Sequence, residues 1–441
     1  MAAIMPAAAR PTAATASATS APLAAALLAA ADLLVAVRAG RNVEVALSGM
    51  PLEGSLRAAA MDLTYTALRA YGRGEFFLSR LISRPLAEPR LHALLLIALA
   101  RLEAQPVRAH TTVDQAVAAA ATLAGGRFKA LVNAVLRNFL RRREALLAAA
   151  ETDEVARHQH PAWWIARLQQ DHPEHWQAIL AAGNTHPPLT LRINRRRIAS
   201  AEFLARLDAA GSAAQVLAGG AVRLAHPVAI ERIPGFADGL CSVQDAGAQR
   251  AAFLLDVQDS QRVLDVCAAP GGKSAHLLEL AEIELTALDV DAARAARIGD
   301  NLARLGLAAT VKVGDGATPD TWWDGRPFDR ILADVPCSAS GVVRRHPDAK
   351  WLRREADIAR FAATQRRIID AIWQTLSLGG KMLYATCSLF AAENEEQVAA
   401  FVGRHADAVR LPLAGSASAL CLQLFPDAEH DGFYYALLQK T

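Results

Sequence analysis

The chain has 441 residues, of which 53% are hydrophobic and 21% charged, and its formal net charge is +3. This length exceeds one ordinary hydrophobic core, so we expect two or three domains. The small charge does not by itself indicate a nucleic-acid partner. Five cysteines without a CxxC pair argue against a disulfide framework and against a metal site, which suits a protein of the reducing cytoplasm.

Residues 1–22 are almost entirely alanine, threonine, serine and proline, with Arg10 as the single charged side chain. Such a segment cannot bury a core, so we expect a disordered tail. The most apolar later stretch, 91–102, contains Arg101 and is too short to span a bilayer. We therefore expect no membrane segment.

Residues 23–155 show apolar positions three and four apart, as in 91–99 and 131–136, with almost no strand pattern. The pattern predicts an all-α bundle. The last helix of this region carries a run of basic residues and only one acidic residue, Glu144. The basic residues are Arg127, Lys129, Arg137, Arg141, Arg142 and Arg143. Such a run is most often a solvated helix face, but in a chain that acts on nucleic acid it becomes a candidate phosphate-binding surface.

Residues 156–238 mix the two periodicities. We predict helices at 163–170 and 176–182, and a strand within the alternating run 189–194. The three tryptophans of these helices, Trp163, Trp164 and Trp176, have the spacing of core residues. The region therefore reads as a small α/β subdomain that leads into the last domain.

Residues 239–441 alternate strand and helix patterns, which predicts βαβ units around a parallel sheet. We expect a Rossmann-like α/β core here. The predicted strands are 262–266, 285–288, 311–313, 330–333 and 381–384, with a closing aromatic strand at 432–438.

A loop of small residues follows the first predicted strand of this core, and a helix follows the loop. The loop consists of Cys267, Ala268, Ala269, Pro270, Gly271, Gly272 and Lys273. Glycines let a backbone approach a ligand closely, but the spacing is neither the dinucleotide nor the triphosphate pattern. Asp289 and Asp315 end the next two strands, where they could hold a ribose and an adenine amino group. Together these features indicate S-adenosylmethionine.

Two cysteine motifs lie 50 residues apart, each directly after a predicted strand: Asp334-Val335-Pro336-Cys337-Ser338 and Ala385-Thr386-Cys387-Ser388. Two thiols with an acid fit methylation of cytosine at C5. A thiolate that adds to C6 turns C5 into a nucleophile, and a second group assists the later elimination. The acid, Asp334, would hydrogen-bond the base at N3 and its exocyclic amine. The spacing alone does not say which cysteine attacks.

In these motifs, the chain resembles the RsmB (Sun/Fmu) family of 16S rRNA 5-methylcytosine methyltransferases. The resemblance rests on segments 191–194, 242–246, 267–273, 300–306, 328–331, 336–348, 350–354, 384–388 and 393–395. The helical region is similar to the RNA-binding NusB fold at 109–117 and 131–137. The resemblance implies a NusB-like domain at 23–155, the small α/β subdomain at 156–238 and the methyltransferase domain at 239–441.

The resemblance implies that Cys387 is the nucleophile and that Cys337 assists release of the methylated base. It makes the loop 267–273, Asp289, Asp315 and Asp334 the S-adenosylmethionine site, without a metal. The implied substrate is cytosine 967 of 16S rRNA, naked or in an early assembly stage of the small subunit. The implied protein is a cytoplasmic monomer. Cys241 and Cys421 match no catalytic motif and would be structural.

A second basic stretch follows the first cysteine motif, and we predict that it contacts the RNA backbone together with Arg137, Arg141 and Arg142. Its members are Arg344, Arg345, Lys350, Arg353 and Arg354. Surface pairing within a helix is the alternative. Val335 stands where the family usually has alanine, and we expect it to add bulk beside the pocket, which could shift the base slightly but removes no reactive group.

Three other functions are alternatives to this one. An RNA adaptor with an inactive core would lack the reactive groups, which are all present here. A tRNA methyltransferase would share the core, but such relatives usually carry accessory domains other than the helical bundle. A DNA methyltransferase would use Cys337 as the nucleophile and would need a target-reading domain after the core.

Overall fold

The computed structural model describes residues 21–413 and 419–441, so nearly all of the predicted tail at 1–22 lies outside the described residues. The chain divides into two compact units, Met1–Ala150 and Glu151–Thr441, each of which is described by itself. The finer domain boundaries at 155 and 238 stay predictions. None of the helices in the described ranges is long and apolar enough to cross a membrane.

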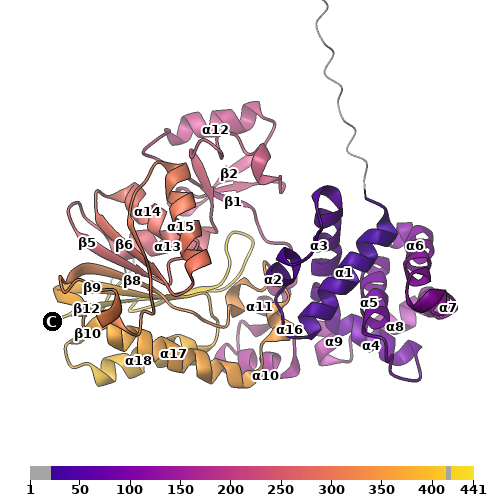
Figure 1. Ribbon diagram of the computed structural model, residues 1–441. Coiled ribbons are helices and arrows are strands. Elements are labelled where there is room, and N and C mark those ends of the chain that lie inside the picture. Colours follow the sequence, from indigo (N-terminus) through magenta and orange to yellow (C-terminus); the bar gives the residue numbers. More distant parts are fainter. Residues whose placement is uncertain (1–20, 414–418) are drawn as a thin grey trace, which may run out of the picture. The chain divides into compact units, whose positions relative to one another are not determined.

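The first unit is all-α, as predicted. Its α-helices are α1 Leu23–Arg38, α2 Val43–Ser48, α3 Gly54–Arg69, α4 Tyr71–Leu81, α5 Pro89–Ala104, α6 Ala109–Ala121, α7 Lys129–Arg141 and α8 Arg143–Ala150. Helix α5 packs against α1, α3, α6 and α7 (Figure 1). Almost every apolar residue of α5 is buried, which is typical of a helix that is hydrophobic on all sides.

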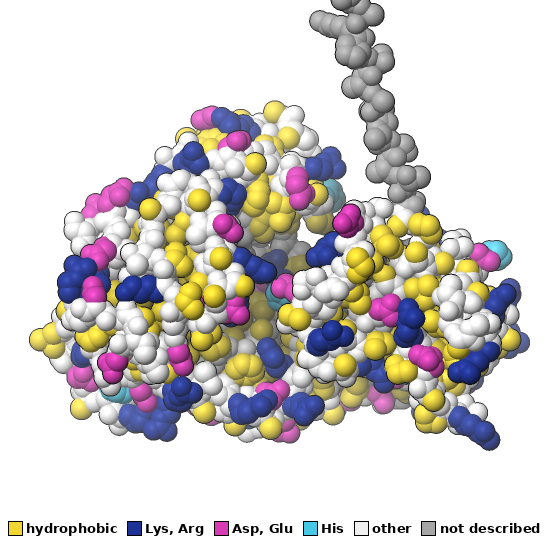
Figure 2. All heavy atoms as spheres, viewed as in Figure 1, with side chains coloured by type: hydrophobic (Ala, Val, Ile, Leu, Met, Phe, Trp, Pro, Cys, Tyr) yellow, Lys and Arg dark blue, Asp and Glu magenta, His cyan; other side chains and the backbone are white. Residues whose placement is uncertain are grey.

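Helix α7 has two distinct faces. Val132, Val135, Leu136 and Phe139 are buried on one face, while Arg137 is exposed on the other. The predicted last helix is in fact two helices, because α7 ends at Arg141 and α8 begins at Arg143. In Figure 2, basic side chains gather over the part of this unit where Figure 1 places α7.

The second unit begins with α9 Glu154–His158, α10 Ala162–Asp171 and α11 Trp176–Gly183. As predicted, the tryptophans of α10 and α11 are core residues. Trp164 is fully buried, and Trp163 and Trp176 pack against the same apolar cluster.

A small antiparallel sheet follows, in the order β2-β3-β1-β4. Its elements are β1 Thr190–Ile193, α12 Ser200–Ala209, β2 Ala214–Val216, β3 Val222–Leu224 and β4 Cys241–Val243. Strand β1 confirms the prediction at 189–194. The sequence did not predict β2, β3 or β4, because three residues are too few to show an alternating pattern.

A large sheet forms the rest of the unit. Its strands are β5 Arg262–Val266, β6 Glu284–Asp289, β7 Thr310–Val313, β8 Phe328–Asp334, β9 Leu376–Thr386, β10 Ala408–Leu411, β11 Leu422–Leu424 and β12 Phe433–Lys440. Its α-helices are α13 Ala246–Leu255, α14 Gly272–Leu280, α15 Ala292–Leu305, α16 Ala349–Leu352, α17 Glu355–Trp373 and α18 Glu395–Arg404. All six predicted strands are present.

The sheet has the order β10-β12-β9-β8-β5-β6-β7, and β11 pairs with β12. Strands β5 to β9 are parallel, but β12 runs antiparallel to both β9 and β10. The predicted purely parallel sheet is therefore wrong for the C-terminal part. A right-handed βαβ crossover joins parallel strands. The chain between β9 and β12 does not form such a crossover, so β12 can lie antiparallel to β9.

Helices cover both faces of this sheet, which explains why its strands read as continuous apolar runs. Figure 1 shows α13, α14 and α15 on one face and α17 and α18 on the other. Each face has its own apolar core. One includes Leu255, Leu277 and Ile298, and the other includes Ile369 and Phe401.

The strand order reverses at β5, which has β6 on one side and β8 on the other. In open α/β sheets, ligands bind at such a switch point, beyond the carboxyl ends of the strands. The parallel strands β5, β6, β7, β8 and β9 all end at this edge. It therefore carries both the predicted cofactor loop and the predicted cysteine motifs.

A buried ion pair joins the small sheet to the large one. Arg192, on β1, contacts Glu279, on α14, with 2.7 Å between Nη2 and Oε1. Both side chains are almost fully buried. Arg192 also donates through Nη1 to the carbonyl of Gly272, at 2.7 Å. The small sheet therefore contacts the first residue of the helix that follows the predicted cofactor loop.

Candidate active site

The loop after β5 is held against the end of β6. The amide of Ala268 donates to the carbonyl of Leu288 at 3.0 Å, and the amide of Ala269 donates to Asp289 at 3.1 Å. Helix α14 begins at Gly272, so the last two residues of the predicted loop belong to the helix. Gly271 precedes it with φ 94°, a left-handed conformation that favours glycine. The predicted cofactor loop is therefore a fixed turn at the switch point.

Two predicted cofactor carboxylates each have an arginine partner. Asp289 is buried and lies 3.2 Å from Arg294 of α15, and it also accepts from the amide of Asp291. Asp315 is partly exposed and lies 3.6 Å from Arg367 of α17. A ligand that uses these oxygens must compete with the two guanidinium groups.

Asp265 was not among the predicted site residues, yet it lies at the end of β5 below the loop. It is fully buried, and Ser274 donates to its Oδ2 at 2.5 Å. Its Oδ1 has no hydrogen-bond partner among the described residues. Burial raises the pKa of Asp265 to about 7, against the opposing hydrogen bond from Ser274. Its position directly before Val266-Cys267 is the one sequence signal that could have found it.

These groups fit S-adenosylmethionine by their chemistry. The ligand brings an ammonium group and ribose hydroxyls, all of which are hydrogen-bond donors, and this edge of the sheet offers carboxylate acceptors, including the unpartnered oxygen of Asp265. In the described part of the chain, no group of three or more histidine, cysteine, aspartate or glutamate side chains could hold a metal ion.

The two predicted reactive cysteines meet. Cys337 lies in the loop after β8 and Cys387 directly follows β9, and their Sγ atoms are 3.3 Å apart. The pKa of Cys337 is raised well above its ordinary value, first by its hydrogen bond with Cys387 and then by burial. Cys337 therefore keeps its proton and can donate it to the sulfur of Cys387. Burial also raises the pKa of the Cys267 thiol in the predicted cofactor loop.

A cation and a carboxylate lie beside the thiols. Lys273 of α14 contacts Asp334 at the end of β8, with 2.7 Å between Nζ and Oδ2. Burial acts to lower the pKa of Lys273, but the charge of Asp334 and its hydrogen bond outweigh burial, with help from Cys387 and Asp265, so the pKa is raised. Lys273 therefore stays positively charged between the cofactor loop and the cysteines.

Glu393 and Asn394 are two further residues of this region, and neither was predicted to have a role. Both side chains are buried, at the point where a short 3-10 turn (Ala391–Glu393) leads into α18. Glu393 accepts hydrogen bonds from Ser338 and Ser388, the residues that follow the two cysteines. Their presence in a motif of the resembled family was the only signal in the sequence.

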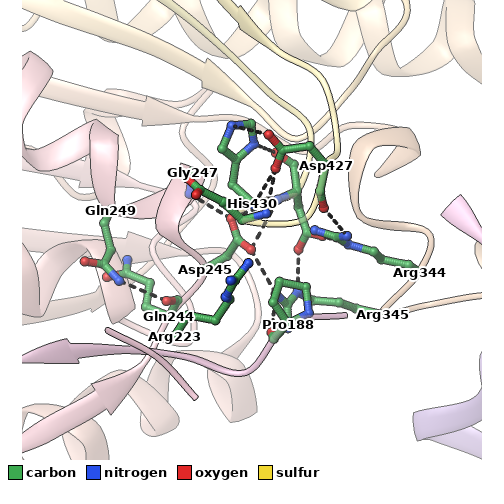
Figure 3. A network of polar contacts seen from close by, with 12 residues as sticks. Pro188, Arg223, Gln244, Asp245, Gly247, Gln249, Arg344, Arg345, Asp427 and His430 are labelled. Carbon is green, nitrogen blue, oxygen red and sulfur yellow. Dashed lines mark hydrogen bonds and ion pairs between the residues drawn. The ribbon is translucent and has the colours of Figure 1, made fainter. Parts of the chain in front are cut away.

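The structure corrects the RNA-contact prediction for Arg344 and Lys350. Arg344 is 2% exposed and pairs through Nε with Asp431, which is itself fully buried. It also donates through Nη1 to the carbonyl of Asp427, at 2.6 Å (Figure 3). Lys350 is fully buried and donates to Asn184 at 2.7 Å. Neither charge faces solvent, because each has a protein partner.

Arg345 is also largely engaged. It pairs with Asp431 and with Asp245, the latter at 2.9 Å, and it donates to the carbonyl of Pro188 (Figure 3). Arg353 donates to the carbonyl of Ser338 at 3.1 Å and lies over the ring of Phe361. Arg354 is exposed, so of this basic stretch it is the residue most open to RNA.

Two further predictions concern the arginines of the first unit and Val335. Arg137, Arg141 and Arg142 of the first unit are exposed, as an RNA surface requires. Val335 is buried in the apolar core on the α17 face of the sheet. Cys267 of the predicted cofactor loop packs against the same core, and the effect of Val335 on the base stays a prediction.

Comparison with known families matches nearly the whole chain. The family described as 16S rRNA methyltransferase RsmB/F matches residues 252–439. A ferredoxin-like domain of RsmF/B-like methyltransferases matches residues 160–231, and the NusB family matches residues 24–141.

Similar proteins agree with these families. Ribosomal RNA small subunit methyltransferase B of Serratia proteamaculans (strain 568) is 46% identical over 390 residues, which cover 87% of this chain and 90% of that protein. The protein of the same name from Sodalis glossinidius (strain morsitans) is 45% identical over 397 residues, covering 88% and 91%.

Solved structures show the same architecture. A methyltransferase homolog protein from Pyrococcus horikoshii is 27% identical with a TM-score of 0.58, covering 66% of this chain and 98% of that chain. The crystal structure of PH0851, 21% identical, has a TM-score of 0.78 and covers 95% and 99%, which shows the shared fold. The chain therefore belongs to the RsmB/F family of 16S rRNA methyltransferases and carries a NusB domain ahead of its methyltransferase core.

Proposed function

We propose that this protein methylates C5 of a cytosine in 16S rRNA, with S-adenosylmethionine as the methyl donor. The observation that carries the proposal is the pair of sulfurs, 3.3 Å apart, at the ends of adjacent strands and beside the Lys273–Asp334 pair. The printed names of the similar proteins support the same substrate class.

Cys387 is the nucleophile in this proposal. Its sulfur adds to C6 of the cytosine, which breaks the aromaticity of the ring and makes C5 nucleophilic enough to accept a methyl group. The geometry is consistent with this assignment, because Cys337 lies within hydrogen-bonding distance of the sulfur of Cys387, and this hydrogen bond together with burial raises the pKa of Cys337. After methyl transfer a base takes the C5 proton, and the electron pair of that C–H bond restores the ring and expels the sulfur of Cys387 from C6. Cys337 assists this release by donating its proton to the departing sulfur across the 3.3 Å contact.

Asp334 and Lys273 prepare the base. Asp334 accepts a hydrogen bond from the exocyclic amine, and it accepts a second one from N3 once N3 takes up a proton as charge develops on the ring. Lys273 holds Asp334 through the 2.7 Å ion pair and places a positive charge close to the attacking sulfur. The target nucleotide must lie outside a base stack to reach these groups.

The loop 267–273, Asp265, Asp289 and Asp315 would bind S-adenosylmethionine, which supplies an electrophilic methyl group. The loop backbone lies at the switch point of the sheet, where such ligands bind in this fold. The amides and carboxylates of these residues orient the ligand, and Lys273 connects its site to the acid that faces the base.

For the substrate, we propose cytosine 967 of 16S rRNA, naked or at an early stage of subunit assembly, as the family implies. The exposed arginines of α7 and its cap, Arg137, Arg141 and Arg142, would contact the RNA backbone. Arg354 would add a contact near the core. We further propose that the protein acts as a monomer in the cytoplasm.

The test is a denaturing gel of Cys337→Ala and Cys387→Ala, each mixed with a 16S rRNA fragment and S-adenosylmethionine. We expect a stable RNA–protein adduct with Cys337→Ala, because attack still occurs but release fails, and none with Cys387→Ala. Cys421→Ala is the matched control, since Cys421 directly precedes β11 and packs against the apolar core on the α17 face of the sheet. It should behave like the wild type.

Two other outcomes contradict parts of the proposal. An adduct with Cys387→Ala alone would exchange the roles of the two cysteines. No adduct with either variant, together with no methyl transfer by the wild type, would reject the substrate or the activity.

A further inference from the structure

Two buried polar residues, Glu393 and Asn394, lie behind the cysteine loops and touch neither sulfur. Glu393 is fully buried and Asn394 is 1% exposed. Burying a carboxylate and an amide is costly unless every oxygen and amino group finds a partner. Each of the two side chains has one partner outside the cysteine loops, Gln365 or Gln423, and its other partners lie in those loops, so the two side chains can determine how the loops are held.

Asn394 contacts the residues on both sides of Cys387. Its Oδ1 accepts from the hydroxyl of Thr386 at 2.6 Å, and its Nδ2 donates to the carbonyl of Ser388 at 2.8 Å. The amide of Ser388 in turn donates to the hydroxyl of Thr386 at 3.1 Å. The single side chain of Asn394 therefore fixes the backbone on both sides of Cys387.

Glu393 connects the loop of Cys387 to the loop of Cys337. Its Oε1 accepts from the amide of Ser338 at 2.8 Å, and its Oε2 accepts from the hydroxyl of Ser388 at 2.5 Å. Gln365 of α17 strengthens the connection, because its Nε2 donates both to Oε1 of Glu393 and to the carbonyl of Pro336. The residues before and after Cys337 are thus held by the same group.

Other contacts agree with this arrangement. The hydroxyls of Ser338, Ser340 and Ser388 lie 3.2 Å from one another, so the two loops also touch directly. Burial raises the pKa of Glu393, while hydrogen bonds from Ser338 and Ser388 oppose that rise. Hydrogen bonds to a charged acceptor are short and directional, so they define the separation of the loops better than apolar packing does.

We propose that Glu393 and Asn394 are positioning residues, Asn394 for Cys387 and Glu393 for the spacing between Cys387 and Cys337. The proposal rests on the proposed function for its meaning, but the spacing of the sulfurs can be measured without RNA. Because Glu393 spans both loops, its loss should separate the thiols and impair release. Asn394 also donates to Gln423 of β11, but of the two cysteine loops its hydrogen bonds in the described residues reach that of Cys387, so its loss should impair attack.

The first experiment follows disulfide formation between Cys337 and Cys387 in the full-length protein. Diamide accepts two hydrogens and becomes a hydrazine, the two thiols lose them, and the S–S bond forms. Peptide mapping identifies the linked pair. Glu393→Ala should slow the linkage by about 10- to 100-fold, the effect expected when hydrogen bonds to a buried charge are removed. Glu396→Ala, which removes an exposed glutamate in the first turn of α18, is the matched control and should match the wild type.

Glu393→Gln keeps an acceptor for Ser338 but replaces the acceptor for Ser388 with a donor, so its rate should fall between wild type and Glu393→Ala. Tryptophan fluorescence verifies that each variant is folded. If Glu393→Ala does not fold, Glu393→Gln carries the test alone. Linkage at the wild-type rate in a folded Glu393 variant would overturn the proposal, whatever the activity of the protein.

The second experiment separates attack from release with RNA and S-adenosylmethionine. With Cys337 present, Glu393→Ala should accumulate the RNA–protein adduct that the wild type resolves. In the Cys337→Ala background, Asn394→Ala should form the adduct about tenfold more slowly. Equal slowing of both steps by both variants would indicate a merely structural role. Altered linkage rates without any methyl transfer by the wild type would reject the proposed function and leave the positioning role standing.

Discussion

The buried Arg344–Asp431 pair allows a decisive test of whether this arginine is structural. Asp431 accepts from Nε of Arg344 and from Nε of Arg345, and it is fully buried while Arg344 is 2% exposed. Replacing Asp431 with alanine removes the counter-ion of a buried guanidinium. Breaking such a pair from one side costs about 3–5 kcal/mol, against a total stability of roughly 5–15 kcal/mol for a domain. We expect Asp431→Ala to lower the free energy of unfolding by that amount.

The assay is urea unfolding followed by tryptophan fluorescence. All 7 tryptophans lie in the second unit, so the signal reports on that unit alone. The matched control is Glu202→Ala, which breaks an exposed pair with Arg206 on α12. Exposed pairs contribute about 0–1 kcal/mol, so the control should unfold almost like the wild type.

A loss below about 1 kcal/mol for Asp431→Ala would refute the reasoning, because the buried pair would then contribute no more than a surface pair. If the variant fails to fold, Asp431→Asn keeps the shape and one acceptor and should give a smaller but measurable loss. A normal stability together with weaker RNA binding would favour the original prediction that Arg344 contacts phosphate.

Two further predictions concern RNA binding and pH. Replacing Arg137, Arg141 and Arg142 with glutamine should weaken RNA binding at low salt. The slope of log affinity against log salt should fall by about 0.7–0.9 for each phosphate that the protein no longer neutralises. An unchanged slope in a salt series would exclude this surface as an RNA contact. Asp265→Asn should remove a pH dependence of stability, because the folded state holds a proton up to about pH 7 that the unfolded chain releases near its ordinary value of 3.8. The free energy of unfolding of the wild type should therefore fall by at most about 1.4 kcal/mol per pH unit as the pH rises from 3.8 to about 7. Urea titrations that find the same slope of unfolding free energy against pH in the variant would contradict the assignment.

The local sequence pattern was enough to predict which edge of the sheet carries the candidate active site. Strands buried on both faces read as short apolar runs, so 262–266 and 381–384 were placed correctly within β5 and β9. Because parallel strands end at one edge, the cysteine motifs after β8 and β9 had to be neighbours. The antiparallel entry of β12 was not predictable, since it depends on a partner strand and not on its own residues.

Charge runs were the weakest guide, because a sequence shows a charge but not its partner. Arg344 and Lys350 looked like RNA contacts, but their partners Asp431 and Asn184 lie 87 and 166 residues away in the chain. Glu393 was missed for the same reason. Its hydrogen bond to Ser338 spans 55 residues, and nothing near Glu393 in the sequence indicates that the carboxylate is buried.

The contact of Arg192 with Gly272 and Glu279 has a mechanical consequence. Domains joined by small polar interfaces usually rotate against each other, but here a desolvated guanidinium joins the small sheet to the start of α14. The small sheet cannot rotate independently without exposing that charge or moving the loop 267–273 with it. An RNA that contacts the small sheet would therefore meet a preorganised surface, so little conformational entropy is lost on binding, and a strained fit there would displace the same loop.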